Sequence, residues 1–373
     1  MITIRAIALR ELEKWILSDE FRTMQVVPIT RHRAISHINN PGAQGDDPVL
    51  WITYENDRMT GYLGALPDLF RGQKEIFRGA WLSCLWIDKN FRGRGIASKL
   101  LKHAFLDWKN RIAIRDYTPE AKTLYESTGK FVPLSENTGN GLRAYLRFDL
   151  HERLPRKFPL LSKISGLLNR YDGVLNAINE SRLAKRMQEI TIATGYSFEE
   201  LPAMDEESSE FIRGFTGQTL NVVDQKLLNW IMSFPWVLED ADKENFSVRY
   251  HFSSYDKRFL FRLMKVKNAQ NNLSALLLFS IRNNHLKLPY AFFSPSVTPV
   301  VGSGIINLMQ QLKLFTFTSY HPEICGWLKK NTTPFCFMRK QHLPAMISRD
   351  FSNELGGTSG KILYDGDSGC GFV

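Results

Sequence analysis

The segment between residues 88 and 98 has the residue types of an anion-binding turn. It reads Asp88-Lys89-Asn90-Phe91-Arg92-Gly93-Arg94-Gly95-Ile96-Ala97-Ser98. Glycine has no Cβ atom, so its backbone can approach a phosphate closely. Where such a turn opens a helix, the unbonded N–H groups and the helix dipole favour an anion, and arginines add positive charge. The segment therefore predicts a phosphate-binding turn, although a tight strand-to-helix turn with solvated arginines would use the same residues.

Two common phosphate motifs are excluded by the residues themselves. The segment lacks the Gly-Lys-Ser/Thr ending of a P-loop. Ser98 stands where the GxGxxG fingerprint of dinucleotide-binding proteins requires its third glycine. A different phosphate-bearing ligand is therefore expected.

The flanking sequence predicts that a mixed α/β sheet positions this turn. The apolar run Ala80–Ile87 is typical of a buried central strand, and apolar residues at helical spacing resume after the turn. Pro28–Asp47 is expected to be a loop. The remaining expected strands are Ile2–Ala6, Val49–Tyr54, Met59–Leu66, Arg111–Tyr117, Phe131–Leu134 and Leu142–Leu150, and the expected helices are Leu9–Phe21, Ser98–Asn110 and Pro119–Thr128.

Two separated motifs in this context resemble one family. Arg92-x-x-Gly95-x-Ala97, after the strand Leu85-Trp86-Ile87, resembles the acyl-CoA pyrophosphate loop of the GNAT superfamily of N-acyltransferases. Ala121-Lys122-Thr123-Leu124-Tyr125-Glu126-Ser127-Thr128-Gly129-Lys130-Phe131 is similar to the family's A-x-x-L-Y-x-x-x-G-F segment, with Lys130 inserted before the phenylalanine. The resemblance covers about residues 1–150, which are therefore expected to form the catalytic, acyl-CoA-binding domain.

The resemblance implies roles for particular residues. Acetyl-CoA would be the acyl donor, with no metal. Tyr125 matches the tyrosine that often protonates the leaving CoA thiolate, although it could equally be a packed helix tyrosine. Thr118 stands where the family often has an asparagine that bonds the pantetheine arm, and capping the next helix is its commoner role. The backbone of Leu85 and Ile87 would pair with pantetheine, and the backbone N–H groups of Arg92, Gly93, Arg94, Gly95, Ile96 and Ala97 would bind the pyrophosphate.

The general base stays unassigned at the sequence level. The family often places a glutamate on the central strand, and Ala80–Ile87 contains no carboxylate. Asp68, Glu75 or a chain of water molecules could replace it, or the amine could arrive already neutral. His32 and His37 are weak candidates, and His103, on the helix after the turn, is expected to be a packing histidine.

A linker and a second half follow. Pro155–Pro159 marks a boundary, and residues 151–188 are expected to form a helical linker. Its apolar residues alternate with Arg and Lys, which can indicate binding to a membrane surface, but a connecting helix is favoured because Asp172 and Glu180 mix the charge.

Residues 189–373 repeat the element order of the first half. The turn Pro299-Val300-Val301-Gly302-Ser303-Gly304 is expected to open a helix, Ile305–Leu312. Pro299 replaces the expected Arg or Gln, and no tyrosine matches Tyr125. This half therefore resembles a degenerate GNAT-like domain without a second CoA site.

Composition limits the class of partner. The chain has 48 Lys and Arg against 38 Asp and Glu, a formal charge of +10, and 43% hydrophobic residues. These values fit a folded protein that prefers anionic ligands. The basic residues are scattered, no apolar run reaches the roughly 20 residues of a membrane span, and the four cysteines lack metal-ligand spacing. We expect a cytoplasmic monomer or homodimer that binds a small-molecule amine and no nucleic acid.

The predicted function is an N-acyltransferase that transfers acetyl from acetyl-CoA to a primary amine by direct attack in a ternary complex. One alternative is a peptidyl transferase of two GNAT-like domains that uses aminoacyl-tRNA, which the positive charge would suit. Another is a non-catalytic CoA-sensing module, which the missing base leaves open.

Overall fold

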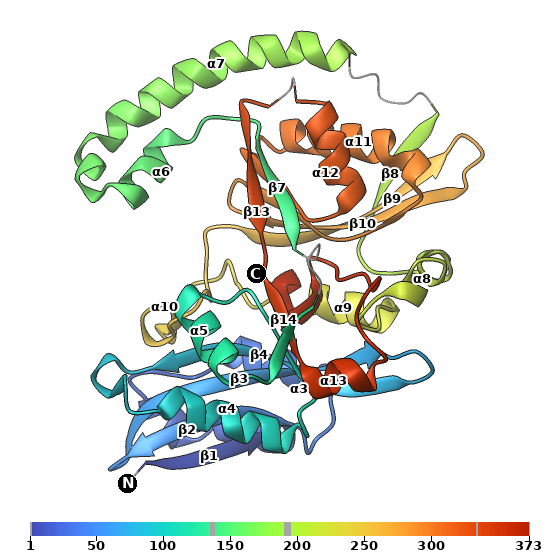
Figure 1. Cartoon of the computed structure of the whole chain (residues 1–373). Helices are drawn as coiled ribbons and strands as arrows, with labels where there is room; N and C mark the ends of the chain where they lie inside the picture. The colour runs from blue at the N-terminus through green and yellow to red at the C-terminus, as the bar shows by residue number, and fades with distance from the viewer. Residues whose placement is uncertain (1, 135–138, 190–194, 333–334, 373) are drawn as a thin grey trace. The chain divides into compact units, whose positions relative to one another are not determined.

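The computed structural model describes residues 2–134, 139–189, 195–332 and 335–372, and its described strands form two seven-stranded sheets (Figure 1). The chain divides into two compact units. Unit 1 comprises Met1–Gly139, Ala203–Phe259 and Leu343–Val373, and unit 2 comprises Asn140–Pro202 and Leu260–His342. Each unit contains one of the sheets.

The sheet of unit 1 is mixed. Its strands follow the order β1 (Thr3–Ala8), β2 (Pro48–Glu55), β3 (Arg58–Arg71), β4 (Ile76–Ile87), β5 (Ile112–Arg115), β14 (Ala345–Ser348) and β6 (Phe131–Pro133). β4 and β5 are parallel, and every other neighbouring pair is antiparallel. The helix α4 (Ile96–Asp107) makes the crossover from β4 to β5.

Helices cover both faces of this sheet, which explains its continuous apolar strands. Trp51, Leu63 and Leu82 pack with α4 on one face, while Ile52 and Tyr62 pack on the other. That second face is covered by α1 (Leu9–Ile16), α2 (Asp19–Thr23) and α3 (Arg31–Ile38). The remaining helices of unit 1 are α5 (Pro119–Ser127), α8 (Glu206–Arg213), α9 (Gln225–Ser233), α10 (Phe246–Arg249) and α13 (Arg349–Glu354).

The sheet of unit 2 has an equivalent arrangement. Its order is β8 (Tyr196–Leu201), β9 (Phe259–Asn268), β10 (Leu273–Arg282), β11 (His285–Phe293), β12 (Thr316–Ser319), β7 (Asn140–Tyr145) and β13 (Phe337–His342). β11 and β12 are parallel and joined through α11 (Thr298–Gln311). α11 and α12 (Pro322–Lys330) pack on the sheet in one core. Unit 2 also contains α6 (Leu150–Lys157), the 3₁₀ turn Pro159–Ile164 and α7 (Ser165–Glu189).

One strand of each sheet comes from the other half of the sequence. β7 follows β6 along the chain but pairs with β12 and β13 in unit 2. β14 follows β13 but pairs with β5 and β6 in unit 1. In Figure 1 the green β7 accordingly lies beside the red β13. The mixed α/β fold with two related sheets is therefore confirmed, while the compact units do not follow the contiguous division into residues 1–150, 151–188 and 189–373.

Two local expectations were wrong. Residues 28–47 contain the helix α3, which Thr30 caps by accepting a hydrogen bond from the Arg33 backbone N–H. The glycines of Pro299–Gly304 lie inside α11 rather than in a turn before it. A Cβ atom on Gly302 would stand 2.5 Å from the Trp327 ring, and one on Gly304 would stand 2.4 Å from the Phe198 ring. These glycines allow close packing, so the segment is no phosphate loop.

Within the described residues, no helix is both long enough and apolar enough to cross a membrane.

Candidate functional site

A β-bulge near the end of β4 shapes the centre of unit 1. Tyr62 pairs with Trp86 and Gly64 pairs with Ser83, so two residues of β4 oppose one residue of β3. Cys84, inside the bulge, has a left-handed backbone with a φ of 55°. The extra residue reverses the alternation of side chains beyond it. Leu85 and Ile87 therefore share the α4 face with Leu82, whereas Cys84 and Trp86 lie on the opposite face.

The buried Arg33 of α3 holds this bulge. Its Nη1 donates to the Cys84 sulfur at 2.9 Å and its Nη2 donates to the Ser83 hydroxyl at 3.0 Å. Nη1 also lies 2.9 Å from the Tyr250 hydroxyl, and the guanidinium stacks on the Trp236 ring at 3.8 Å. A side chain from a segment that was expected to be a loop thus fixes the geometry of the central strand.

β4 and β5 separate beyond this point. Their described pairs run from Ala80 with Ile112 to Leu82 with Ile114, although β4 continues to Ile87. The backbone edge of Leu85 and Ile87 that faces β5 therefore has no strand partner among the described residues. An extended ligand could supply one by adding as a strand.

The glycine-rich turn lies directly after β4. A 3₁₀ turn at Lys89–Phe91 leads into Arg92, and Gly93 and Gly95 have φ angles of 77° and 72°. Gly95 is the N-cap of α4, and a Cβ on either glycine would meet no atom within 4 Å. Open space therefore adjoins both glycines just before the first turn of α4, which begins with Ile96 and Ala97, as an anion site at a helix N-terminus requires.

The two arginines of the turn differ in their surroundings. The Arg94 guanidinium forms an ion pair with Glu55 at 3.1 Å and lies 4.9 Å from the centre of the Phe91 ring. Arg92 is exposed and makes no hydrogen bond or ion pair with any described residue. Of the two, Arg92 is the cation that remains available to an anionic ligand.

The helix α5 positions the second motif. Thr118 is its N-cap, with the hydroxyl accepting a hydrogen bond from the Ala121 N–H at 3.3 Å. Tyr125 is buried, and its ring packs against Tyr117 and Phe131 at centroid distances of 5.7 and 5.6 Å. Burial, and secondarily Tyr117, raises the pKa of Tyr125 above its ordinary value. Its hydroxyl therefore keeps its proton at neutral pH and has no hydrogen-bond partner among the described residues.

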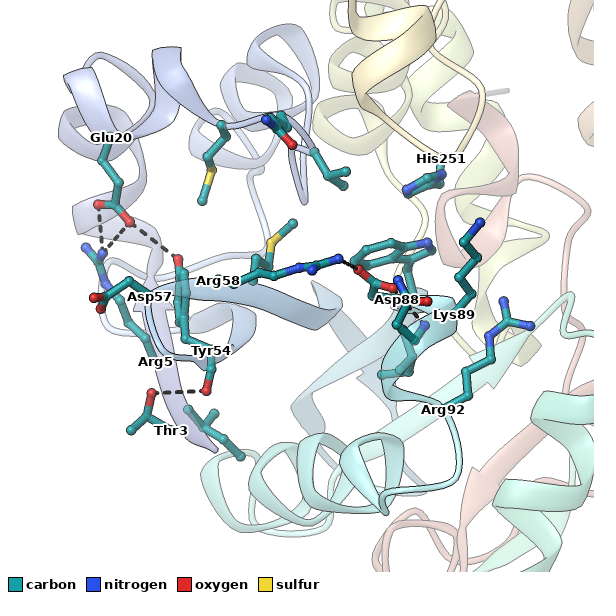
Figure 2. A pocket seen from close by; sticks show the side chains of 18 of the residues that line it. Thr3, Arg5, Glu20, Tyr54, Asp57, Arg58, Asp88, Lys89, Arg92 and His251 are labelled. Atoms are coloured by element: carbon teal, nitrogen blue, oxygen red, sulfur yellow. Dashed lines mark hydrogen bonds and ion pairs between the residues drawn. The ribbon is translucent and has the colours of Figure 1, made fainter. Parts of the chain in front are cut away.

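A groove of about 1430 Å³ opens beside the end of β4 (Figure 2). It is lined by residues of β1, α2 and the segment after it, the β2–β3 hairpin, the end of β4 with its following turn, and His251. Ile87 and Arg92 are the residues of the predicted site that line it. The groove therefore joins the predicted donor site to the face of the sheet that α1–α3 cover.

Ion pairs in this groove join Arg5 with Glu20 at one end and Arg58 with Asp88 nearer the other end, beside Lys89 (Figure 2). Glu20 accepts hydrogen bonds from Arg5 at 2.9 Å and from the Tyr54 hydroxyl at 3.3 Å. Lys89 and Arg92, at the opposite end, make no ion pair with a described residue. Among the described lining residues, the unpaired positive charge of the groove therefore lies beside the glycine turn.

His251 lines this groove with its imidazole ring. Its ring stacks on Trp86 at a centroid distance of 4.6 Å and an angle of 14°. Partial burial lowers the pKa of His251, and Asp88 opposes that shift. His251 was not predicted from the sequence because it lies 165 positions after Trp86, and no local motif marks it.

The candidate bases named from sequence lie elsewhere. Asp68 lies near the C-terminal end of β3, opposite Gly79, and Glu75 directly precedes β4 at the end remote from the bulge. His37 is buried against Trp236, while His32 bonds the Trp236 carbonyl. His103 was expected to pack, but it is exposed on α4. None of these residues lines the groove.

The described residues contain no group of three or more His, Cys, Asp or Glu side chains placed to hold a metal ion.

Comparisons with known proteins agree with this geometry. The family model described as "Acetyltransferase (GNAT) domain" matches residues 46–129, from before β2 to the end of α5. One similar solved structure is a conserved protein of Enterococcus faecalis V583 described as a probable N-acyltransferase. Its identity is 9%, its TM-score 0.52, and the match covers 92% of this chain and 72% of that chain. Another is a GCN5-related N-acetyltransferase from Anabaena variabilis ATCC 29413, with 10% identity, a TM-score of 0.51, and coverage of 93% and 72%. No curated protein sequence matches the chain.

At these identities the solved structures establish the fold alone, a mixed α/β fold. The family match places a GNAT acetyltransferase domain at residues 46–129, within unit 1. The sheet of unit 2 repeats the same strand order.

Proposed function

We propose that the protein is an acyl-CoA-dependent N-acyltransferase that transfers acetyl from acetyl-CoA to a primary amine. The observation that carries this proposal is the continuous path in unit 1 from the unpaired end of β4 through the glycine turn to the N-terminus of α4. Such a path offers a strand edge to an extended arm and backbone N–H groups to a diphosphate, and the family match supports it.

The donor would bind along this path. N–H groups of residues 93–97 would contact the pyrophosphate, and Arg92 would add a direct charge contact. The backbone of Leu85 and Ile87 would pair with the pantetheine amides. Arg94 would act indirectly, because its ion pair with Glu55 steadies the turn.

The acceptor would enter through the groove. The neutral amine attacks the thioester carbonyl, the carbon–sulfur bond breaks, and the thiolate leaves. His251 would remove a proton from the amine, a role that its lowered pKa suits because the ring is neutral at pH 7. Tyr125 would donate a proton to the thiolate, a role that its raised pKa suits because the phenol remains protonated.

A calorimetric titration with acetyl-CoA tests the donor site. We expect one site per chain and roughly tenfold or greater loss of affinity in Gly95→Asp, because the new carboxylate repels the phosphates and disturbs the amides that bind them. Gly360→Asp is the matched control. It also introduces aspartate at a positive φ, 76°, in open space, but far along the chain from the turn.

Failure of the wild-type protein to bind acetyl-CoA would refute the proposal. Binding without release of free thiol in the presence of a panel of primary amines would instead favour the CoA-sensing alternative. Two sites per chain would show that unit 2 also binds the donor.

A further inference from the structure

An apolar stripe lies on the outer side of the 3₁₀ turn Pro159–Ile164 and of α7. The outer stripe consists of Leu160, Ile164, Leu167, Tyr171, Val174 and Ile178, whose side chains are between 42% and 82% exposed. Their spacing alternates between four and three residues, which places them along one side of a helix. Proteins rarely leave so many large apolar side chains together in water, so the outer stripe marks an interaction surface.

The opposite side of α7 is fixed within unit 2. Asn176 accepts a hydrogen bond from the Phe148 N–H at 2.7 Å and donates to the Phe148 carbonyl at 3.0 Å. Asn179 donates to the Leu146 carbonyl at 2.8 Å, and Asp172 contacts the His151 N–H and ring at 2.8 Å. Rotating α7 to bury the outer stripe would break these bonds. The helix therefore has a second apolar side that its own unit does not cover.

The charges around the outer stripe indicate what covers it. Lys157, Lys163 and Arg170 are exposed beside it, and the Lys157 ammonium lies 5.5 Å from the centre of the half-exposed Phe158 ring. Between residues 157 and 179 the one acidic residue is Asp172, which is 2% exposed and bonded to His151. The exposed surface of this segment is therefore positive and apolar, and the next acidic residue, Glu180, is held in an ion pair with Arg147.

A second copy of the chain fits this surface poorly. Paired helices gain partner choice from opposite charges that flank the apolar seam, and this seam has lysine and arginine alone. Lys163 and Arg170 of one copy would approach the same charges of the other. Anionic lipid headgroups supply the missing charge, and the acyl boundary beneath them accepts the apolar side chains.

We propose that the outer stripe and Lys157, Lys163 and Arg170 bind the surface of a membrane that contains anionic lipids, with α7 lying along that surface. The proposal rests on unit 2 alone and is independent of the acyl-transfer activity. It reverses the preference for a simple connecting helix that the sequence pattern suggested.

Sedimentation of the full chain with lipid vesicles tests this. The vesicles contain phosphatidylcholine alone or mixed with phosphatidylglycerol, and we expect binding to the mixture. Leu167→Asp should weaken that binding roughly tenfold or more, because it places a charge where the leucine side chain would enter the lipid. Leu106→Asp is the matched control, since Leu106 of α4 is 63% exposed and Leu167 is 66% exposed.

The charge contribution is tested separately. The double variant Lys163→Gln, Arg170→Gln should bind mixed vesicles roughly 30-fold more weakly. Lys329→Gln, Lys330→Gln, at exposed positions of α12, should bind as the wild type does. Thermal unfolding by circular dichroism shows that each variant is folded.

Three outcomes would overturn the proposal. The first is no binding of the wild-type protein to either vesicle. The second is equal binding to vesicles with and without phosphatidylglycerol. The third is a wild-type dimer in sedimentation velocity that Leu167→Asp dissociates, which would assign the outer stripe to a second copy of the chain.

Discussion

At the scale of single residues, His251 gives the groove a group that titrates near neutral pH. Because partial burial lowers its pKa, the imidazole is neutral at pH 7 and becomes protonated as the pH falls. A protonated imidazole cannot accept the amine proton. We therefore expect a plot of log(kcat/KM) against pH to fall on its acidic side with a slope of one, as for a single protonation. His251→Gln should lower the neutral-pH plateau of this plot roughly 100-fold and abolish the acidic fall.

The control for this pH profile is His103→Gln, because His103 is exposed on α4 and outside the groove. It should keep both the plateau and the acidic limb. If His251→Gln kept the acidic fall in kcat/KM, His251 would not be the proton acceptor. The fall would then be due to protonation of the acceptor amine.

Asp68 is a second unusual residue, and its effect is on stability. Burial, and secondarily Asp367, raises the pKa of Asp68 to about 8. Its carboxyl oxygen lies 2.6 Å from the side-chain amide nitrogen of Asn221, while the side-chain oxygen Oδ1 of Asn221 is buried and has no hydrogen-bond partner among the described residues. Flipping this amide would let a protonated Asp68 donate to that oxygen. The neutral acid is thus the form that fits the folded protein.

The sign of the resulting pH dependence follows from proton binding. Between an unfolded pKa near 4 and a folded pKa near 8, the folded state binds the extra proton, so the free energy of unfolding falls as pH rises. The slope contributed by this residue is at most about 1.4 kcal/mol per pH unit, and it ends above pH 8. Asp68→Asn should remove this slope in urea titrations from pH 5 to 8. A slope unchanged by the substitution would contradict the raised pKa.

At the scale of elements, the strand–turn–helix at residues 80–107 was predictable from the sequence because each part has a local cause. An apolar run predicts a buried strand, two glycines predict a turn, and helical spacing follows. The bulge at Cys84 was not predictable, since both faces of β4 are apolar and an inserted residue changes no pattern. α3 was missed because its eight residues include arginines and histidines that tertiary contacts bury.

The glycines of α11 are explained by side-chain packing and not by a local turn. The sequence suggested a turn, but Gly302 lies in the helix against Trp327, where an added Cβ would stand 2.5 Å from the ring. Gly302→Ala should therefore lower the free energy of unfolding by about 1–3 kcal/mol, because overpacking exceeds the gain in helix propensity. Gly326→Ala in α12 is the control, since its Cβ would meet no atom within 4 Å, and it should stabilise by about 0.4–1 kcal/mol. Chemical denaturation measures both, and a stabilising Gly302→Ala would contradict the close packing.

At the scale of the whole molecule, the order of elements was predictable but the sheet to which two of them belong was not. β7 continues the pattern of the first half, and nothing local distinguishes pairing with β6 from pairing with β12. β14 is four residues long, Ala345–Ser348, and its partners β5 and β6 lie more than 200 positions earlier. His251 was missed for the same reason, since only tertiary structure brings it to Trp86.

This exchange of strands predicts that the first half cannot fold alone. In residues 1–150, β6 would lose β14, its described strand neighbour, and the core around α1 would lose Phe246 and Tyr250. We expect this fragment to show no cooperative thermal unfolding. Co-expressed with residues 151–373, it should co-purify as a stable complex, because it supplies β7 to one sheet and receives β14 in the other. The uncut chain is the reference for the melting transition. A cooperative transition in the isolated fragment would mean that β7 can take the position of β14 beside β5, and that the exchange is one of two arrangements of similar stability.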